Sequence, residues 1–375
     1  MSTGPGYQEA TMAGDRETGP GVARTATLYD VARAAAVSTA TVSRVINSSD
    51  PVRPATRRRV LAAIEELGYV PDGSAQSLAQ RRKEVIGLLA VISRGPETDV
   101  ERQGSLFIEE VLRGLESSVS DVGWSVLISF LRDSDPPSAY QRMLRMSAKV
   151  DGLVIAEDIV GRKQLAKLAV RVPIALIAND SRGVHADSIG VDNRSGTESM
   201  VRHMVERHGR TRLFYITGPA EALDALERRA AFDDAVASYP EVTVAGYYAG
   251  HFGAVSGQLA VRELLAGPRR DLPDAIICAN DQTAIGAMRD LQAAGIRVPA
   301  DIAVVGFDDM HVSALLTPPL TTVRQPMREL GERACSFLLE RVADPALPPR
   351  AERLPTELII RESCGCGPHS AAAAR

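Results

Sequence analysis

Short hydroxyl groups and one arginine share a face of the segment between residues 39 and 47. At helical spacing, the outward positions of this segment are Thr39, Ala40, Thr41, Ser43 and Arg44. A surface helix that serves only solubility usually carries several Glu and Lys residues, whereas this face carries no acid. Such a face can approach a phosphate backbone closely, and the Arg44 guanidinium can donate to guanine N7 and O6 or to a phosphate. The chemistry that this segment suggests is nucleic-acid recognition.

Cysteine and histidine residues offer a second kind of chemistry, which is metal binding. Four cysteines in 375 residues do not suggest a disulfide framework, and this is typical of a reducing cytoplasm. Cys364 and Cys366 form a C-G-C sequence, but the sequence shows no second pair of ligands beside them. His203 and His208 are five residues apart, a spacing that does not put both on one face of an α-helix. No metal site and no cofactor are therefore predicted.

Motifs of common enzyme classes are absent from the sequence. It has no G-x-S-x-G elbow, no G-x-x-x-x-G-K-[ST] loop and no G-x-G-x-x-G after a strand. Asp133 and Asp135 lie in a proline-containing loop, where a solvated turn is the ordinary interpretation. No catalytic residue is predicted, and the chain is predicted not to be an enzyme.

Two short helices must hold the polar face in place. The spacing of Thr27 and Asp30 is that of a capping box, which predicts a helix from Leu28. After a turn, Ser38 can cap a second helix, which Asn47 can end. The residues predicted to face inward are Leu28, Val31, Ala32, Ala35, Val37, Val42, Val45 and Ile46.

A third helix is predicted from Pro54, a favoured first-turn residue, to Leu67, with Gly68 as its C-terminal stop. The start of this helix is basic, and its arginines are Arg53, Arg57, Arg58 and Arg59. Three short helices with a basic edge make a helix-turn-helix module, which is a common way to place a helix against DNA.

Charge is distributed unevenly along the chain. The net charge is −4, but residues 24–83 carry ten Lys and Arg against five Asp and Glu, which gives +5 and leaves −9 for the rest. A basic head on an acidic body is typical of a DNA-binding module joined to a different functional domain. A solvated basic face with no partner is the alternative interpretation of the same charges.

From Val85 onward, short apolar runs alternate with amphipathic segments of helix length. The strand candidates are residues 85–92, 124–130, 151–156, 173–178, 212–217, 242–248, 275–279 and 303–307. This alternation predicts an α/β fold of βαβ units, with parallel sheets that carry helices on both faces, and so many strands suit two sheets. Ligands in such folds lie beyond the carboxyl ends of the strands, which predicts a site in the cleft between two lobes.

The compartment and the class of the larger part can also be argued from the sequence. No apolar run reaches the ~18 residues that a membrane span needs, and the N-terminus has no apolar core of a signal peptide. A cytoplasmic, nucleoid-associated protein with no membrane partner is therefore expected. A solute-binding protein of a transporter shares the two-lobed architecture, but it needs export and has no use for a basic helix-turn-helix head.

The run ATLYDVARAAAVSTATVSRVINSSDPVRPATRRRVLAAIEELGYVPDGSAQSLA resembles the headpiece of the lactose-repressor (LacI/GalR) family almost position for position. The resemblance continues through VDN (191–193), ICAND (277–281), VPADIAVVGFDD (298–309) and LTPPLTTVRQP (316–326). It implies a sequence-specific transcriptional repressor that binds a pseudo-palindromic operator as a homodimer. A small-molecule effector, expected to be a sugar or a sugar derivative, would release it. Induction is the usual response in this family and corepression the less common one, and the sequence does not choose between them.

The resemblance also implies how the chain is divided. A disordered leader (1–25) precedes the helix-turn-helix domain (26–70) and a hinge helix or linker (71–83). The effector-binding and dimerisation domain (84–366) has the architecture of periplasmic binding proteins and is followed by a disordered tail (367–375). Its N-lobe is expected at about 84–192 and 326–354, and its C-lobe at about 193–325 and 355–366. A dimer is expected rather than a tetramer, because no leucine heptads follow the C-G-C sequence.

The family pattern assigns roles within the headpiece. Base readout is expected from Thr39, Ala40 and Arg44, with Thr41 on the same face. Positions near the DNA backbone are Leu28, Tyr29, Ser38, Ser43, Asn47, Thr56 and Tyr69. In this family, the leucine that corresponds to Leu78 wedges into the minor groove of the operator, and the resemblance implies the same role for Leu78. The alternative interpretation of Leu78 is an ordinary linker residue. Ala36 replaces the glycine that is usual in the turn, which costs about 1 kcal/mol if its φ is positive.

The family pattern also assigns an effector site. The residues that match its contacts are Arg228, Asn280, Asp308, Phe252 and Asp192. Each of three has a structural alternative: Arg228 can pair with Glu227 or Asp224 instead, Asp308 can cap the following helix, and Phe252 can be a core residue. Ala178 stands where many sugar-responsive members have an aspartate, so the identity of the ligand does not follow.

Overall fold

Two units make up the chain, residues 1–81 and 82–375, and each has its own hydrophobic core. The structure is a computed structural model that describes residues 26–47, 52–69, 82–92, 106–132, 136–156 and 160–367. The expected leader, Leu78 with the hinge as far as residue 81, and the tail after Gly367 lie outside these residues. None of the helices in the described ranges is long and apolar enough to cross a lipid bilayer.

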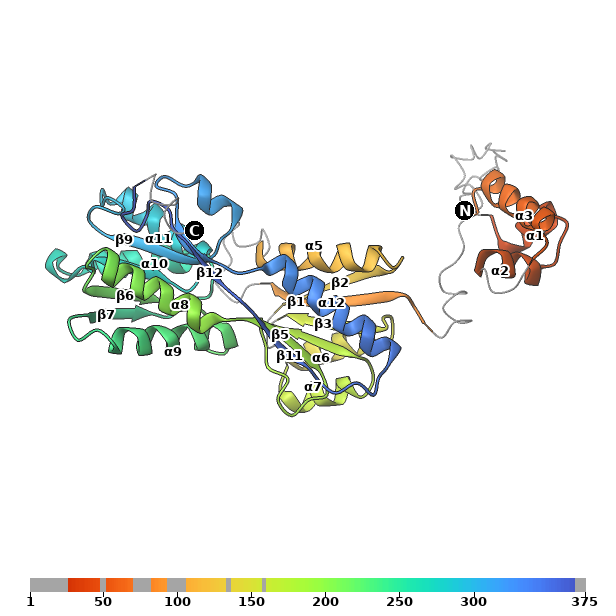
Figure 1. The fold of residues 1–375 in the computed structure, drawn as a ribbon, viewed down its shortest axis with the longest axis horizontal. Coiled ribbons are helices and arrows are strands. Elements are labelled where there is room, and N and C mark those ends of the chain that lie inside the picture. The colour runs from red at the N-terminus through yellow and green to blue at the C-terminus, as the bar shows by residue number, and fades with distance from the viewer. Residues whose placement is uncertain are drawn as a thin grey trace, which may run out of the picture. The chain divides into compact units, whose positions relative to one another are not determined.

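The smaller unit consists of three helices, as the sequence predicts. They are α1 (Leu28–Ala34), α2 (Thr39–Asn47) and α3 (Pro54–Leu67) (Figure 1). Val31, Val42 and Val60 lie at the centre of the core they share, and each is fully buried. The predicted capping box is confirmed, because Thr27 Oγ1 accepts from the Asp30 amide and Asp30 accepts from the Thr27 amide in return.

Two turns shape this unit. Ala36, between α1 and α2, has a φ of 50°, so it adopts the left-handed conformation in which its side chain costs about 1 kcal/mol relative to glycine. Gly68 ends α3 with a φ of 57°, as a helix stop that glycine adopts without strain. The N-cap of α3 is Arg53, whose side chain makes no capping hydrogen bond.

The first lobe of the larger unit contains a six-stranded parallel sheet in the order β11-β5-β4-β3-β1-β2. Its strands are β1 (Val85–Ile92), β2 (Ser125–Arg132), β3 (Gly152–Ala156), β4 (Ile174–Ile177), β5 (Asp187–Val191) and β11 (Ala351–Leu354). Its helices are α5 (Leu106–Ser120), α6 (Pro136–Ser147), α7 (Arg162–Ala169) and α12 (Met327–Ala343).

The second lobe contains another six-stranded sheet, in the order β12-β10-β9-β8-β6-β7, in which only the β10–β12 pairing is antiparallel. Its strands are β6 (Arg212–Ile216), β7 (Thr243–Tyr248), β8 (Ala275–Cys278), β9 (Ala303–Asp308), β10 (Thr321–Arg324) and β12 (Glu357–Ile359). Its α-helices are α8 (Asn193–Arg202), α9 (Leu223–Ala237), α10 (Ala254–Ala266) and α11 (Asp281–Ala293).

Both faces of the inner strands of the first sheet are buried, which is why strands such as β3 and β4 read as continuous apolar runs. Along β3, Leu153 and Ile155 join one hydrophobic cluster, while Val154 and Ala156 join the other. Helices therefore cover both faces, as the alternation of apolar and amphipathic segments predicts. The predicted α/β fold with two parallel-rich sheets is confirmed (Figure 1).

The chain passes between the two sheets three times. It leaves the first sheet after Val191, returns after Arg324, and leaves again after Leu354. Each sheet thus takes its last strand from the C-terminal part of the chain. Asp192, at the first passage, lies beside the third, because its amide donates to Leu354 O and its carbonyl accepts from Thr356 Oγ1.

The end of α8 departs from α-helical geometry. A π-helical turn covers His203–Arg207, with hydrogen bonds that span five residues instead of four. The sequence prediction that His203 and His208 lie on different helix faces is therefore wrong. Their Nε2 atoms are 3.2 Å apart, because the wider turn brings residues five apart onto one side.

Candidate functional site

The outward face of α2 is the candidate DNA-binding surface. Ser38 Oγ accepts from the Thr41 amide at 3.2 Å and lies 2.9 Å from Thr41 Oγ1, so the predicted cap of α2 is present. Arg44 is exposed, and its Nε donates to Ala40 O at 3.3 Å, which lays the side chain along the helix. Neither α2 nor the start of α3 carries an acid in its first turn. Nothing on this face repels a phosphate.

The other predicted DNA contacts divide into exposed and packed side chains. Tyr29 is 76% exposed and so is free to reach a partner. Leu28 and Tyr69 pack against the core of the unit, so both also stabilise the fold. Thr56 is half-buried at the start of α3. Asn47 is the last residue of α2, and Leu78 lies outside the described residues, so the roles of both stay predictions.

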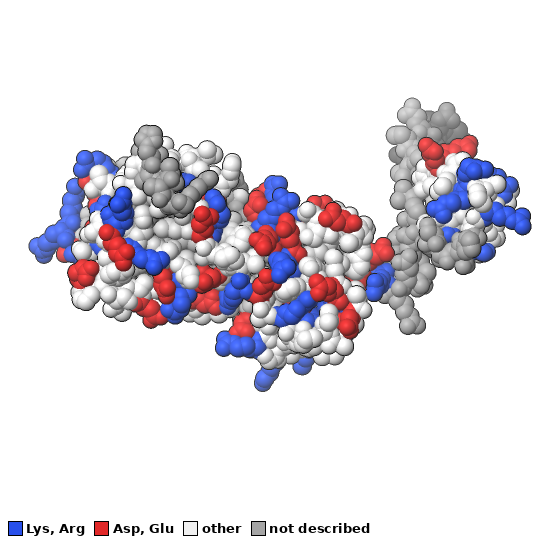
Figure 2. All heavy atoms as spheres, in the orientation of Figure 1, with Lys and Arg blue, Asp and Glu red and all other residues white. Residues whose placement is uncertain are grey.

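The smaller unit also carries exposed positive charge at the start of α3. All four arginines near the start of α3 are exposed, namely Arg53, Arg57, Arg58 and Arg59. Figure 2 shows basic side chains, all of them arginines, on the smaller unit. Such a surface attracts a polyanion without regard to its sequence, which leaves selectivity to the side chains of α2.

The candidate effector site lies at the carboxyl edge of the second sheet. Asn280 follows β8, Asp308 closes β9, and Phe252 follows β7. Arg228 joins them from the first turns of α9. The structure brings these four residues together, since Arg228 Nη1 donates to Ala279 O at 2.7 Å and Asn280 Nδ2 donates to Phe252 O at 2.8 Å.

Arg228 is the centre of this group and is only 3% exposed. Its Nε donates to Asn193 Oδ1 at 2.8 Å, and its guanidinium lies 3.7 Å from the centroid of the Phe307 ring. Two carboxylates stand further away, with Asp224 at 3.7 Å and Asp308 at 3.9 Å. Both distances exceed hydrogen-bonding range, so neither carboxylate is hydrogen-bonded to the guanidinium. The ion pair between Arg228 and Asp224, which the sequence offered as an alternative to ligand binding, is therefore present only as a 3.7 Å contact.

Asn280 and Phe252 are positioned by local contacts. Asn280 caps α11, because its Oδ1 accepts from the Thr283 amide at 3.1 Å. Phe252 has a φ of 64°, and its ring packs onto Gly218, where a Cβ atom would lie 2.3 Å from the ring. The ring is half-buried, so it is neither a core residue nor a fully open stacking surface.

Asp308 is buried and accepts a hydrogen bond from Gln325 Nε2 at 2.5 Å. It does not cap the following 3-10 helix (His311–Leu315), which the sequence left as an alternative. The Met310 amide instead donates to Asp281 Oδ2 at 2.9 Å. Burial raises the pKa of Asp308 to about 8, because the attraction of Arg228 only partly offsets the loss of hydration and Asp281 adds repulsion.

This raised pKa predicts how stability depends on pH. Between the unfolded pKa of about 3.9 and the folded value, the folded protein keeps a proton that the unfolded chain has lost, so stability falls as pH rises across this window. In Asp308→Asn the side chain stays neutral and still accepts from Gln325. Between pH 5 and pH 8 the variant should therefore lose less stability than the wild type does. The difference should be at least about 1.4 kcal/mol, the equivalent of one pKa unit. Denaturant unfolding at the two pH values measures it, and the exposed Asp121→Asn is the control. An unchanged pH dependence in Asp308→Asn would contradict the assignment.

Asn193 belongs to this site, whereas the sequence prediction named its neighbour Asp192 instead. Asp192 caps α8, with Oδ1 accepting from the Ser195 amide at 3.0 Å and Oδ2 from Ser195 Oγ at 2.6 Å. Asn193 is buried and connects Arg228 to two acids, because its Nδ2 donates to Asp224 at 2.8 Å and to Glu227 at 2.7 Å. The VDN sequence carried the signal, but only the fold shows which of its two polar residues faces Arg228.

The polar contacts continue into the first lobe. Arg353 of β11 donates to Glu227 through Nη2 at 2.6 Å and through Nη1 at 3.1 Å. Beside this pair, a polar cavity of about 330 Å³ lies between the lobes. Its lining includes Asn179 and Asp180, which follow β4, together with Glu227 and Arg353. A cavity of this size is at the lower end of the range for small-molecule sites.

Comparisons with known proteins decide the family. The description "Bacterial regulatory proteins, lacI family" matches residues 27–72, and "Periplasmic binding protein-like domain" matches residues 201–364. The HTH-type transcriptional repressor PurR of Aliivibrio fischeri (strain ATCC 700601 / ES114) is 34% identical over 346 residues, which cover 90% of this chain and 98% of that protein. The chain belongs to the lacI family of bacterial regulatory proteins. As a member of it, the chain is a transcriptional repressor with a DNA-binding domain and an effector domain, and it is not an enzyme.

Other members of the lacI family show the same extent of similarity. The ribose operon repressor of Escherichia coli (strain K12) is 34% identical over 349 residues, covering 90% of this chain and 98% of that protein. The structure of the lac repressor dimer bound to operator and the anti-inducer ONPF aligns with a TM-score of 0.77 at 29% identity, over 91% of this chain and 99% of that one. A complex of the regulator CelR with cellobiose aligns with a TM-score of 0.64 at 30% identity, over 90% and 99%.

Proposed function

We propose that the chain represses transcription in the cytoplasm as a homodimer on a pseudo-palindromic operator, and that a sugar or sugar derivative bound between the lobes releases it. The observation that carries the proposal is the continuous set of contacts from Arg228 through Asn193 and Glu227 to Arg353. It joins the predicted ligand site of the second lobe to a strand of the first. A ligand shifts an equilibrium only through contacts that differ between two states, and a ligand that competes for Arg228 alters contacts on both lobes.

An exposed sheet edge supports the homodimer. Strand β2 is the edge of the first sheet, and three of its apolar side chains are more than a third exposed: Leu127 (37%), Ile128 (37%) and Phe130 (42%). An apolar strand edge of this kind readily pairs with another chain, and soluble proteins usually cover it. A related structure, the lac repressor, is described as a dimer. Two headpieces on a dimer would read two half-sites, which raises specificity.

Arg44→Ala tests the recognition surface. If Arg44 contacts a base, the variant loses its preference at one operator position, at a cost of about 1–3 kcal/mol for the preferred sequence. Sequencing of DNA selected from a random pool gives the operator and the preference at each position, for the wild type and the variant. Arg33→Ala is the control, because Arg33 is exposed on α1 and already pairs with Asp30. A uniform loss of affinity over all sequences would show that Arg44 contacts phosphate instead.

The effector half of the proposal is tested by thermal unfolding against a panel of sugars and sugar acids. A ligand at a hundred times its dissociation constant adds about 2.7 kcal/mol to the stability of the folded state, which raises the melting temperature clearly. Adding the same ligand to the operator complex then gives the sign of the response. Release indicates induction, and tighter binding indicates corepression. If no sugar raises the melting temperature, the proposal that the effector is a sugar fails, and other classes of metabolite become the candidates.

A further inference from the structure

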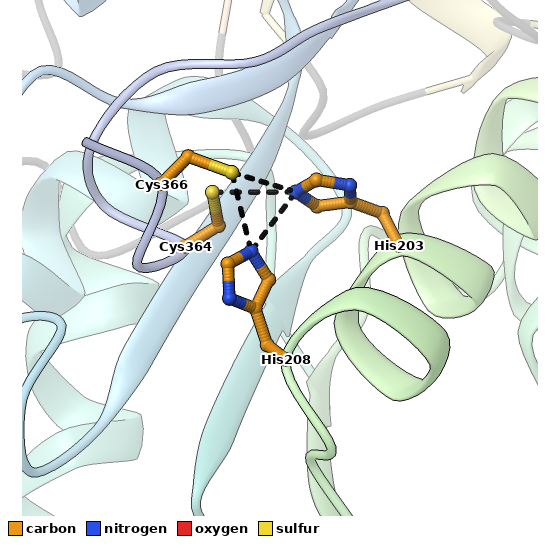
Figure 3. A group of neighbouring side chains, drawn as sticks. All are labelled: His203, His208, Cys364 and Cys366. Atoms are coloured by element: carbon orange, nitrogen blue, oxygen red, sulfur yellow. Dashed lines mark hydrogen bonds between the residues drawn. The ribbon is translucent and has the colours of Figure 1, made fainter. Parts of the chain in front are cut away.

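A cluster of four side chains that are not part of the effector site has the chemistry of a metal centre. His203 begins the π turn after α8 and His208 follows it, while Cys364 and Cys366 flank Gly365 after β12. One ligand atom from each residue lies within 4.8 Å of all the others. Figure 3 shows both Nε2 atoms and both sulfur atoms pointing toward one another. Within the described part of the chain, no other group of His, Cys, Asp and Glu side chains has this arrangement.

The distances fit a tetrahedral ion of the size of zinc. With Zn–N of about 2.0–2.1 Å and Zn–S of about 2.3 Å, neighbouring ligand atoms lie about 3.3 Å apart for N–N and about 3.6 Å apart for N–S. The two Nε2 atoms are 3.2 Å apart. The N–S distances are 3.4 Å from His203 to Cys364, 3.4 Å from His208 to Cys366 and 3.7 Å from His203 to Cys366. Four of the six edges of the cluster are thus close to those of a zinc tetrahedron, and the other two, from Cys364 to His208 and to Cys366, are no longer than 4.8 Å.

The turn between the two cysteines allows both sulfur atoms to lie close to the histidines. Gly365 has a φ of 112°, a conformation that residues with side chains rarely adopt, and a Cβ atom there would lie 3.1 Å from His208 Nδ1. Glycine therefore lets both cysteines face the same point and leaves space for the His208 ring. Both sulfurs are buried, Cys364 fully and Cys366 with 9% of the residue exposed. The surrounding protein would shield an ion from water.

A second layer of contacts orients one of the sulfurs. Thr321 Oγ1 accepts from the Arg361 amide at 2.8 Å, which leaves its proton free to donate to Cys364 Sγ at 3.1 Å. A hydroxyl that donates to sulfur stabilises a thiolate, and contacts of this kind are typical around metal ligands. Two thiolates also neutralise a divalent cation, so the occupied site would bury no net charge.

We propose that His203, His208, Cys364 and Cys366 bind one zinc ion. Two sulfur and two nitrogen ligands in a tetrahedron favour zinc over the harder cations, which prefer oxygen. All four positions are supplied by the protein, so the ion has no open position for a substrate and its role is structural. It fastens the segment after β12 to the end of α8, the helix whose first residue, Asn193, contacts Arg228. Binding replaces the two thiol protons, which pass to solvent.

The test is metal analysis of the full chain purified without chelators. We expect about one zinc ion per chain, loss of the ion to a strong chelator, and a melting temperature that falls on chelation and recovers when zinc is returned. Cys366→Ser and His208→Gln should each reduce the zinc content to near zero. Two matched variants should keep one zinc ion: His311→Gln, at an exposed histidine, and Cys335→Ala, at a buried cysteine of α12.

Cobalt substitution of the wild-type chain keeps the test decisive even if a variant fails to fold. A tetrahedral site with two thiolates gives Co²⁺ strong visible bands together with sulfur-to-metal charge-transfer bands, and zinc added in equal amount removes them. The proposal is overturned if the chain binds neither ion, if the cobalt spectrum is the weak one of six-fold oxygen coordination, or if Cys366→Ser retains its zinc. The four side chains would then be a hydrogen-bonded cluster only.

Discussion

Replacing Arg341 by alanine is expected to lower the free energy of unfolding of the larger unit by about 3–5 kcal/mol. Arg341 lies in α12 and is 2% exposed, and its partner Asp187, at the start of β5, is fully buried. The guanidinium donates to both carboxylate oxygens, at 2.9 and 2.7 Å. It also donates to the carbonyls of Leu347 and Pro348. The Arg341 side chain thus links α12 to the start of β5 and to the segment that precedes β11.

The size of this effect comes from what the substitution leaves behind. Without Arg341, the carbonyls of Leu347 and Pro348 lose a donor, and Asp187 keeps the longer contacts from the Arg350 side chain, at 3.3 and 3.4 Å, and the hydrogen bond from the Arg350 amide. Burial alone would raise the pKa of Asp187, but the hydrogen bonds from Arg341 and Arg350 outweigh it and hold the pKa below its usual value. The contribution of this carboxylate is therefore present at neutral pH and is lost as pH falls through the folded pKa.

A matched control on the same helix isolates burial from charge. Arg333 also makes a two-pronged contact, with Glu352 of β11, but its side chain is 43% exposed and that of Glu352 is 27% exposed. Arg333→Ala should cost less than about 1 kcal/mol, because solvent screens a pair of this kind. Denaturant unfolding of the two variants gives the comparison. Equal losses would mean that burial does not set the strength of the Arg341 contacts.

Arg228→Ala is expected to leave operator binding intact and to abolish most of the response to the ligand. Truncating one partner of a buried, charged and hydrogen-bonded group typically costs about 2–5 kcal/mol of binding, which is roughly 30-fold to several thousand-fold in affinity. The midpoint of ligand-driven release from fluorescent operator DNA measures this directly. The variant should bind the DNA with the affinity of the wild type, since Arg228 belongs to the larger unit and the recognition helix to the smaller.

The neighbouring Arg229→Ala is the control for this experiment. Arg229 lies on the same helix, but its Nε pairs with Asp233 at 2.8 Å and its guanidinium covers the Tyr247 ring at 3.4 Å. It takes no part in the contacts around Asn193, so its variant should respond to the ligand as the wild type does. A normal response of Arg228→Ala would remove Arg228 from the effector site and leave it with a structural role only.

The sequence was most informative where local signals and burial agree. The capping residue Thr27, the proline at the start of α3 and the glycine after it marked helix ends that the structure has at the same places. Eight strands were found from their apolar runs, which are clearest where both faces are buried, as in β3 and β4. Four strands were missed because their sequences contain polar residues, even where the strand itself is buried. For example, β5 begins with Asp187 and β11 reads AERL, so neither looks apolar.

The sites show a similar limit. Arg228, Asn280, Asp308 and Phe252 follow strands or start a helix, so their gathering at one sheet edge could be predicted from topology and family resemblance. The His203 and His208 pair could not, since it depends on one π-helical turn that no sequence pattern announces. Their approach to Cys364 and Cys366 depends further on β12, a short strand that supplies no apolar run.

The order of elements along the chain has a consequence for synthesis on the ribosome. Both sheets of the larger unit take an edge strand from near the end, β11 and β12, and α12 reaches the first sheet only shortly before them. Neither lobe is complete until residues beyond 350 have left the exit tunnel. The three helices of the smaller unit, in contrast, are complete at Tyr69, roughly 300 residues earlier, and domains generally fold as units during translation. The nascent chain thus carries a finished DNA-binding module for most of its elongation, while the part that responds to ligand is still an unfinished, chaperone-accessible polypeptide.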